Sequence, residues 1–144
     1  MGNGDSIRIE LVNFWDIEQI VELYRSIGWW KDFMDKSRIP DLIRGSYLFA
    51  LAIDTSSGKP SGMGRVISDG IADAYIQDLV VLPEWRKKNA GGMIVSALIE
   101  QCVSSGISWI GLIAQPGTDA FYRSIGFEPM TGHVPMLYHG GREE

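Results

Sequence analysis

The stretch Ala74–Ala97, AYIQDLVVLPEWRKKNAGGMIVSA, predicts a β-strand that leads through a basic turn into an α-helix. Its first part is dense in aliphatic and β-branched residues, and Pro83 ends the strand because proline cannot donate to a sheet ladder. The turn then carries cations followed by small or flexible residues, namely Arg86, Lys87, Lys88, Asn89, Ala90, Gly91 and Gly92. Because the first N–H groups of a helix are unpaired and its dipole favours negative charge there, the stretch predicts an anion-binding site.

Length and composition are those of an ordinary globular protein. The 144 residues, 45% hydrophobic and 22% charged, predict a single domain spanning 1–144 with its own core. The net charge of −5 argues against a nucleic-acid partner, and no apolar stretch approaches the length needed to cross a membrane. Cys102 is the one cysteine, and it lies in an apolar helix pattern, which predicts a core residue in a reducing, cytoplasmic setting.

Hydrophobic periodicity and turn residues predict an α+β domain with a mixed sheet. In chain order we expect a strand over 6–12, a helix from Asp16 to Gly28, a short helix over 40–45, strands over 47–54 and 62–67, the strand and helix of the opening stretch, a central strand over 107–114, a short helix over 120–126 and a final hairpin of 127–130 and 134–138. Gly62 and Gly64 weaken the strand that contains them, which predicts a bulge or a close backbone approach.

Two segments together resemble the GNAT superfamily of N-acetyltransferases. Residues 81–92, VLPEWRKKNAGG, are similar to its acetyl-CoA signature, and residues 120–127, AFYRSIGF, are similar to its second signature, FYxxxGF. The resemblance implies a GNAT-like fold, a central mixed and mostly antiparallel sheet flanked by about four helices. In the third place after Arg86, where the family usually has glycine, this chain has Asn89, the non-glycine residue that best tolerates a positive φ.

The resemblance also implies that an acetyl group moves from acetyl-CoA, a co-substrate, to an amine. It implies cofactor contacts from the strand end and the turn, which are Leu79, Val80, Val81, Arg86, Lys87, Lys88, Asn89, Ala90, Gly91 and Gly92. Tyr122 falls where the family has the catalytic tyrosine that donates a proton to the departing thiolate, a role that suits a phenol. The alternative role for Tyr122 is that of a core aromatic beside Phe121.

A general base is harder to assign. Related acetyltransferases often carry Glu on the strand before the turn, where this chain has Tyr75, Gln77 and Asp78. Asp78 is the candidate catalytic carboxylate, although strand alternation puts it on the face opposite Tyr75 and Gln77 unless a bulge intervenes. The alternatives are an Asp78 that only hydrogen-bonds backbone, a base role for Asp69 or Asp73 through water, and no dedicated base.

The expected acceptor is the primary amine of a small molecule. Trp29, Trp30 and Phe33 are unusually apolar for a connection, and they predict an acceptor pocket, packing against the sheet, or the contact of a homodimer. His133 and His139 lack the spacing of metal ligands, so no metal site is expected. The alternative functions are acetylation of a protein or peptide and a non-catalytic acyl-CoA-binding sensor.

Overall fold

A computed structural model describes residues 6–140 of the chain. The elements in chain order are β1 (Ile7–Leu11), α1 (Ile17–Ser26), the 3₁₀ helix η2 (Lys36–Arg38), α2 (Ile39–Gly45), β2 (Leu48–Asp54), β3 (Pro60–Ser68), β4 (Asp73–Val81), the 3₁₀ helix η3 (Pro83–Lys88), α3 (Ala90–Ser104), β5 (Trp109–Gly111) and α4 (Asp119–Ser124). The chain forms two compact units, with the boundary between Leu112 and Ile113. The five strands therefore lie in the first unit and α4 lies in the second. The single domain over 1–144 stays a prediction.

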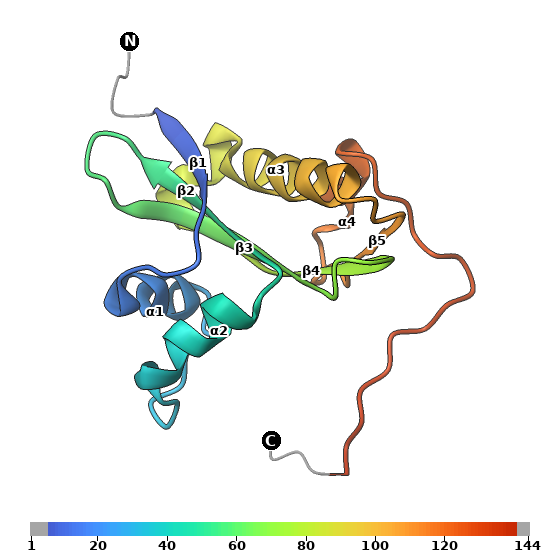
Figure 1. The fold of residues 1–144 in the computed structure, drawn as a ribbon, viewed down its shortest axis with the longest axis horizontal. Coiled ribbons are helices and arrows are strands. Elements are labelled where there is room, and N and C mark those ends of the chain that lie inside the picture. The colour runs from blue at the N-terminus through green and yellow to red at the C-terminus, as the bar shows by residue number, and fades with distance from the viewer. Residues whose placement is uncertain (1–5, 141–144) are drawn as a thin grey trace. The chain divides into compact units, whose positions relative to one another are not determined.

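The first unit is built on one mixed sheet in the order β1-β2-β3-β4-β5. Neighbouring strands are antiparallel from β1 to β4, whereas β4 and β5 are parallel. Figure 1 shows α3 across one face of this sheet and α1 and α2 on the other. The structure therefore confirms the predicted α+β class with a mixed, mostly antiparallel sheet.

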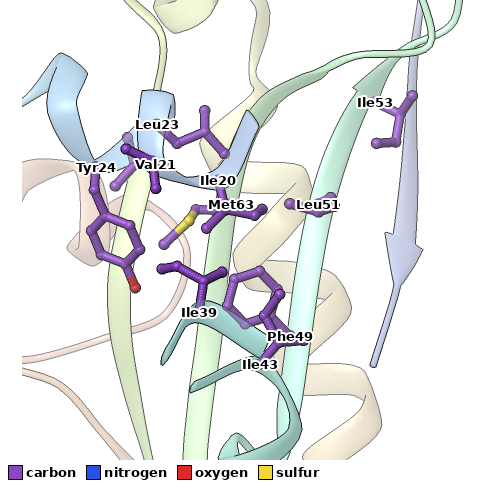
Figure 2. Packing of buried hydrophobic residues seen from close by; sticks show 11 residues of the cluster. Ile20, Val21, Leu23, Tyr24, Ile39, Ile43, Phe49, Leu51, Ile53 and Met63 are labelled. Carbon is purple, nitrogen blue, oxygen red and sulfur yellow. The ribbon is translucent and has the colours of Figure 1, made fainter. Parts of the chain in front are cut away.

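A buried apolar layer joins α1 and α2 to the sheet (Figure 2). Its members are Ile20, Val21, Leu23, Tyr24, Ile39, Ile43, Phe49, Leu51, Ile53, Met63 and Val80. Burying one such side chain stabilises a fold by about 1.5–3 kcal/mol, so this layer fixes both helices against the strands. Asp16 caps α1, because its side chain accepts a hydrogen bond from the Gln19 N–H at 3.0 Å, and it lies where the sequence predicted the helix to begin.

On the opposite face, glycines let α3 approach the sheet closely. A Cβ atom added to Gly64 would lie 2.8 Å from Cγ2 of Ile94, and one added to Gly62 would lie 3.2 Å from Cδ1 of the same side chain. The pairing of β3 with β4 also shifts register at this point. The predicted close approach is confirmed, and the extra residue of the bulge lies on β4, opposite Gly64. Cys102 is fully buried here, as expected of a core residue.

Two predictions for the later part of the chain are wrong. The apolar run over 107–114 is not a central strand, because β5 covers only Trp109–Gly111 and is the last strand of the sheet. The final hairpin is absent, because residues 112–140 contain no strand in the described structure. Pro129 and Pro135 interrupt the two segments, and a proline has no N–H with which to join a ladder.

Candidate active site

The turn that follows β4 has the conformation that the sequence allowed. After η3, Asn89 takes φ 64° and ψ 21°, which is the left-handed region, and α3 begins at the next residue. This confirms the expectation that Asn89 takes a positive φ in the turn. The side chain of Asn89 then lies over Gly92, where an added Cβ would be 2.4 Å from Oδ1 of Asn89. A side chain at position 92 would therefore force the Asn89 side chain to move.

The start of α3 presents a row of backbone donors. The first backbone bond into the helix runs from the Met93 N–H to the Asn89 oxygen at 3.0 Å, so the N–H groups of Ala90, Gly91 and Gly92 precede the helical ladder. Asn89 makes no side-chain cap to them. Uncapped donors at the positive end of a helix 15 residues long suit an anion such as a pyrophosphate.

The three cations of the turn are exposed around these donors. Arg86 Nε donates to the carbonyl oxygen of Val81 at 3.0 Å and so ties the end of β4 to the turn. The Lys88 ammonium lies 5.2 Å from the centre of the Trp85 ring, a cation–π contact. The contacts of Arg86, Lys87 and Lys88 with a cofactor stay predictions.

A β-bulge shapes β4 just before the turn. Asp78 and Leu79 together oppose the single β3 residue Gly64, and Asp78 takes a left-handed φ of 56°. Leu79 reaches the α3 side, where its Cδ1 would lie 3.5 Å from a Cβ on Gly64. The Asp78 carboxylate instead meets Tyr24 of α1. The bulge that the sequence left open is therefore present, and it reverses the face that simple alternation gives Asp78.

Three side chains from three elements meet at this bulge. Oδ2 of Asp78 accepts hydrogen bonds from the Tyr24 hydroxyl at 2.8 Å and from Nε of Arg65 at 2.7 Å. The side chains of Arg65 and Asp78 are only 17% and 20% exposed. Burial, and then the neighbouring Asp78 carboxylate, raise the pKa of Tyr24, so the phenol stays a proton donor. We name this group the Asp78 cluster.

The sequence did not point to Tyr24 or Arg65 as partners of Asp78. In the sequence Tyr24 falls on the apolar face of the helix predicted from Asp16 to Gly28, and its distance of 54 positions from Asp78 carries no motif. A charged Arg65 inside the apolar run from Gly62 to Ile67 was the one signal that a partner was needed. The alternative in which Asp78 bonds only backbone also differs from the structure, because these two partners are side chains.

Strands β4 and β5 part after a short parallel pairing. The pairs run from Asp73 and Trp109 to Tyr75 and Gly111, and the rest of β4 has no partner in β5. Leu79–Val81 therefore have no strand partner in β5, although the Val81 carbonyl accepts the hydrogen bond from Arg86. An unpaired strand edge offers backbone donors and acceptors to an extended ligand.

Tyr122 lies on α4 in the second unit, among aromatic rings. Its ring meets Phe121 and Phe127 edge-on, with centroids 4.9 Å and 5.9 Å away. Burial raises the pKa of the Tyr122 hydroxyl, which therefore keeps its proton at neutral pH. Aromatic packing and proton donation are both compatible with this environment, and the catalytic role stays a prediction.

The aromatic residues after α1 divide into two kinds. Trp29 and Trp30 are partly buried against the α1–α2 core, which is the packing role named among the alternatives. Phe33 is 86% exposed. Together with Trp30 it borders a cleft of about 460 Å³, lined also by Met34, Asp35, Arg38, Ile39, Asp41 and Leu42.

The remaining titratable candidates are exposed. Asp69 is a turn residue whose Oδ1 accepts the Ile71 N–H at 2.8 Å, and Asp73 is exposed at the start of β4. His133 and His139 are exposed in the second unit. Within residues 6–140, no group of three His, Cys, Asp or Glu side chains is placed to hold a metal ion, and no helix is long and apolar enough to cross a membrane.

Comparisons with known proteins agree with this architecture. The uncharacterised N-acetyltransferase ycf52 of Porphyra purpurea is 30% identical over 116 residues, which cover 81% of this chain and 65% of that protein. The chloroplastic serotonin N-acetyltransferase 2 of Oryza sativa subsp. japonica is 33% identical over 73 residues, or 51% of this chain and 36% of that protein. The chain thus spans less than two thirds of the length of both relatives.

A solved structure shares the fold. The GNAT family acetyltransferase from Streptococcus pneumoniae TIGR4 superposes with a TM-score of 0.80 at 22% identity, covering 95% of this chain and 100% of the other. The model of a family described as the acetyltransferase (GNAT) domain matches residues 19–135, which include the bulged strand, the basic turn and α4. From the match over most of its length, we conclude that the chain belongs to the GNAT acetyltransferase family.

Proposed function

We propose that the chain is an N-acetyltransferase that moves the acetyl group of acetyl-CoA to the primary amine of a small molecule by direct attack. The observation that carries this proposal is one continuous feature: the unpaired edge of β4 leads through the basic turn to the uncapped donors of α3. Family membership supports acetyl-CoA as the co-substrate, because GNAT acetyltransferases generally use it. When bound, acetyl-CoA supplies the thioester that an amine attacks.

The chain's own groups divide the binding of acetyl-CoA between them. We assign the pyrophosphate to the N–H groups of Ala90, Gly91 and Gly92, with Asn89 shaping the turn that presents them. Arg86, Lys87 and Lys88 add a favourable field around it. The backbone of Leu79, Val80 and Val81 holds the pantetheine arm along the unpaired edge.

Two side chains move protons in this proposal. A primary amine resembles lysine, with a pKa of about 10.4, so it must lose a proton before it attacks. Oδ2 of Asp78 is already engaged by Tyr24 and Arg65, whereas Oδ1 accepts no hydrogen bond from a described residue and is the oxygen assigned to take this proton through water. Tyr122, which keeps its proton at neutral pH, donates to the departing thiolate.

The test combines binding and turnover. Acetyl-CoA is titrated calorimetrically, and thiol release is measured with small amines, amino acids and a peptide set. Replacing Tyr122 by Phe should lower turnover by about 10²–10⁴-fold while the Kd for acetyl-CoA stays unchanged. Tyr138→Phe, which alters an exposed tyrosine of the same unit, is the matched control and should be neutral.

Three results would overturn parts of the proposal. Absence of acetyl-CoA binding would refute both the enzyme and the sensor alternative. Binding without thiol release from any acceptor would favour the sensor. Activity confined to peptides would replace the small-molecule acceptor by a protein or peptide.

Assembly and location are two further proposals. We propose a homodimer, which light scattering on the purified chain tests directly. The cytoplasmic location that the single cysteine predicts competes with a plastid, since the rice relative is named chloroplastic. Imaging of the full-length protein in its own cells distinguishes the two compartments.

A further inference from the structure

Two exposed aromatic side chains lie side by side on neighbouring strands of the first unit. The rings of Tyr75 on β4 and Trp109 on β5 have centroids 5.1 Å apart and are tilted by 58°. Tyr75 is 46% exposed and Trp109 is 37% exposed, although large aromatic residues are usually well buried. Ile67, the register partner of Tyr75 on β3, is 43% exposed beside them. These three residues form the aromatic shelf.

A glycine is needed to hold the shelf together. An added Cβ on Gly111 would lie 2.5 Å from the Trp109 ring, so this ring lies directly over the backbone of Gly111. Gly111 is also the register partner of Tyr75. The tryptophan therefore folds along its own strand towards Tyr75, and any side chain at 111 would displace it.

The shelf lies at the point where β4 and β5 part. The pair of Tyr75 and Gly111 is the last one between the two strands, and beyond it β4 has no partner in β5. At about 3.3 Å per residue, the unpaired edge from Ile76 to Val81 is roughly 20 Å long. A ligand arm laid along that edge from the turn of α3 extends towards the two rings.

The charge beside the shelf favours a cation. Asp73 is the register partner of Trp109 and lies two positions before Tyr75, so all three share one face of the sheet. Its side chain is exposed, and it forms no ion pair with a described residue. An unpaired carboxylate at the edge of an aromatic surface attracts an ammonium and disfavours an anionic acceptor.

We propose that the aromatic shelf binds the body of the acceptor and selects primary amines that carry an aromatic ring. This inference rests on the proposed acetyl transfer, because an acceptor on the shelf can react only if acetyl-CoA binds along the neighbouring edge of β4. Ring-to-ring contact in an offset or edge geometry adds to plain apolar burial, and its usual strength corresponds to a preference of about 3- to 10-fold. Tyr75 and Trp109 are then the residues that determine specificity.

The experiment compares two amines that differ only in aromaticity. 2-Phenylethylamine and 2-cyclohexylethylamine have the same carbon skeleton, and simple burial favours the more apolar cyclohexyl compound. The kcat/KM for acetyl transfer and the calorimetric Kd are measured for both amines. We expect the native chain to prefer the phenyl amine by about 3- to 10-fold, and the preference to vanish in Trp109→Leu and Tyr75→Leu.

Two further variants sharpen the result. Gly111→Ala should displace the Trp109 ring without removing it, and should also reduce the preference. Phe14→Leu removes a ring that is 74% exposed between β1 and α1, away from the shelf residues in the sequence, and should leave the preference unchanged.

The outcomes separate this inference from the proposed function. If the native chain acetylates both amines equally well, or if the shelf variants lose activity towards both amines to the same extent, selection of aromatic amines by the shelf is refuted and acetyl transfer remains in place. If no acceptor releases thiol, acetyl transfer is refuted, and the calorimetric Kd values still decide the shelf. Tighter binding of the cyclohexyl amine by the native chain would refute it.

Discussion

Replacing Asp78 by asparagine is expected to cost the protein about 2–3 kcal/mol of unfolding free energy. The change keeps the size of the side chain and an oxygen that accepts a hydrogen bond, but it removes the negative charge that faces Arg65 at 2.7 Å. Asparagine tolerates the left-handed φ of 56° as aspartate does, so backbone strain contributes little to the difference.

The magnitude follows from the partial burial of the pair. Removing one partner of a fully buried ion pair costs about 3–5 kcal/mol, and a hydrogen bond to a charged group is worth about 1.5–3 kcal/mol. The side chains of Arg65 and Asp78 are 17% and 20% exposed, so water screens part of the charge left on Arg65. A hydrogen bond from Arg65 to the neutral asparagine oxygen recovers another part of the lost interaction energy. The expected cost therefore falls in the range for a hydrogen bond to a charged group, not in the range for a fully buried ion pair.

The assay is urea unfolding followed by circular dichroism, with Arg65→Gln and the double variant completing a mutant cycle. The coupling energy between positions 65 and 78 should exceed about 1.5 kcal/mol, and the melting temperature of Asp78→Asn should fall by roughly 10 °C. Asp41→Asn is the control, because its pairs with arginines are on the surface and should contribute less than about 1 kcal/mol. A cost below about 0.5 kcal/mol for Asp78→Asn, or an additive cycle, would refute the reasoning.

Three other predictions concern stability. Because the pKa of Tyr24 is raised in the folded state, the unfolded chain loses this proton first, near pH 10, so the unfolding free energy is full below that pH and falls above it. Tyr24→Phe should flatten this decline when the unfolding free energy is measured from about pH 9 to 11. If the native chain and the variant give parallel curves, the prediction is contradicted. Gly92→Ala should lower the melting temperature because its Cβ meets the Asn89 side chain, and Asn89→Gly in the same chain should restore it. Gly64→Ala should cost about 1–3 kcal/mol in urea unfolding by crowding α3, whereas Gly45→Ala, with no atom within 4 Å of the new Cβ, should be neutral or stabilising.

The chain from β1 to the start of α3 was the most predictable part. Hydrophobic patterning located β1 to β4 within a few residues, and the start of the first helix at Asp16 and the left-handed Asn89 followed from the chemistry of those two side chains. Local signals sufficed here because each feature depends on neighbours a few positions away. The run over 107–114 failed as a central-strand prediction, because only Trp109–Gly111 pair with β4 and Ile113 is 66% exposed, although the run is largely apolar.

In the candidate site, too, the features formed by adjacent residues were predictable and those formed by distant residues were not. The turn from Arg86 to Gly92 is contiguous, so its cations and free helix N–H groups were evident from the order of residues. The Asp78 cluster was not, because Tyr24 comes from α1 and Arg65 from β3, and only the folded sheet brings them to the bulge. The same is true of Tyr75 and Trp109, which are distant in the sequence and meet where two parallel strands part.

The sequence by itself thus determined the strand, turn and helix of the opening stretch, because propensity, proline and glycine act through the local backbone. It left undecided on which face Asp78 lies. The tertiary structure decided that, since the bulge depends on β3 offering one residue, Gly64, opposite two of β4 under the close packing of α3. A register between strands is a property of the pair, and neither strand's sequence states it alone.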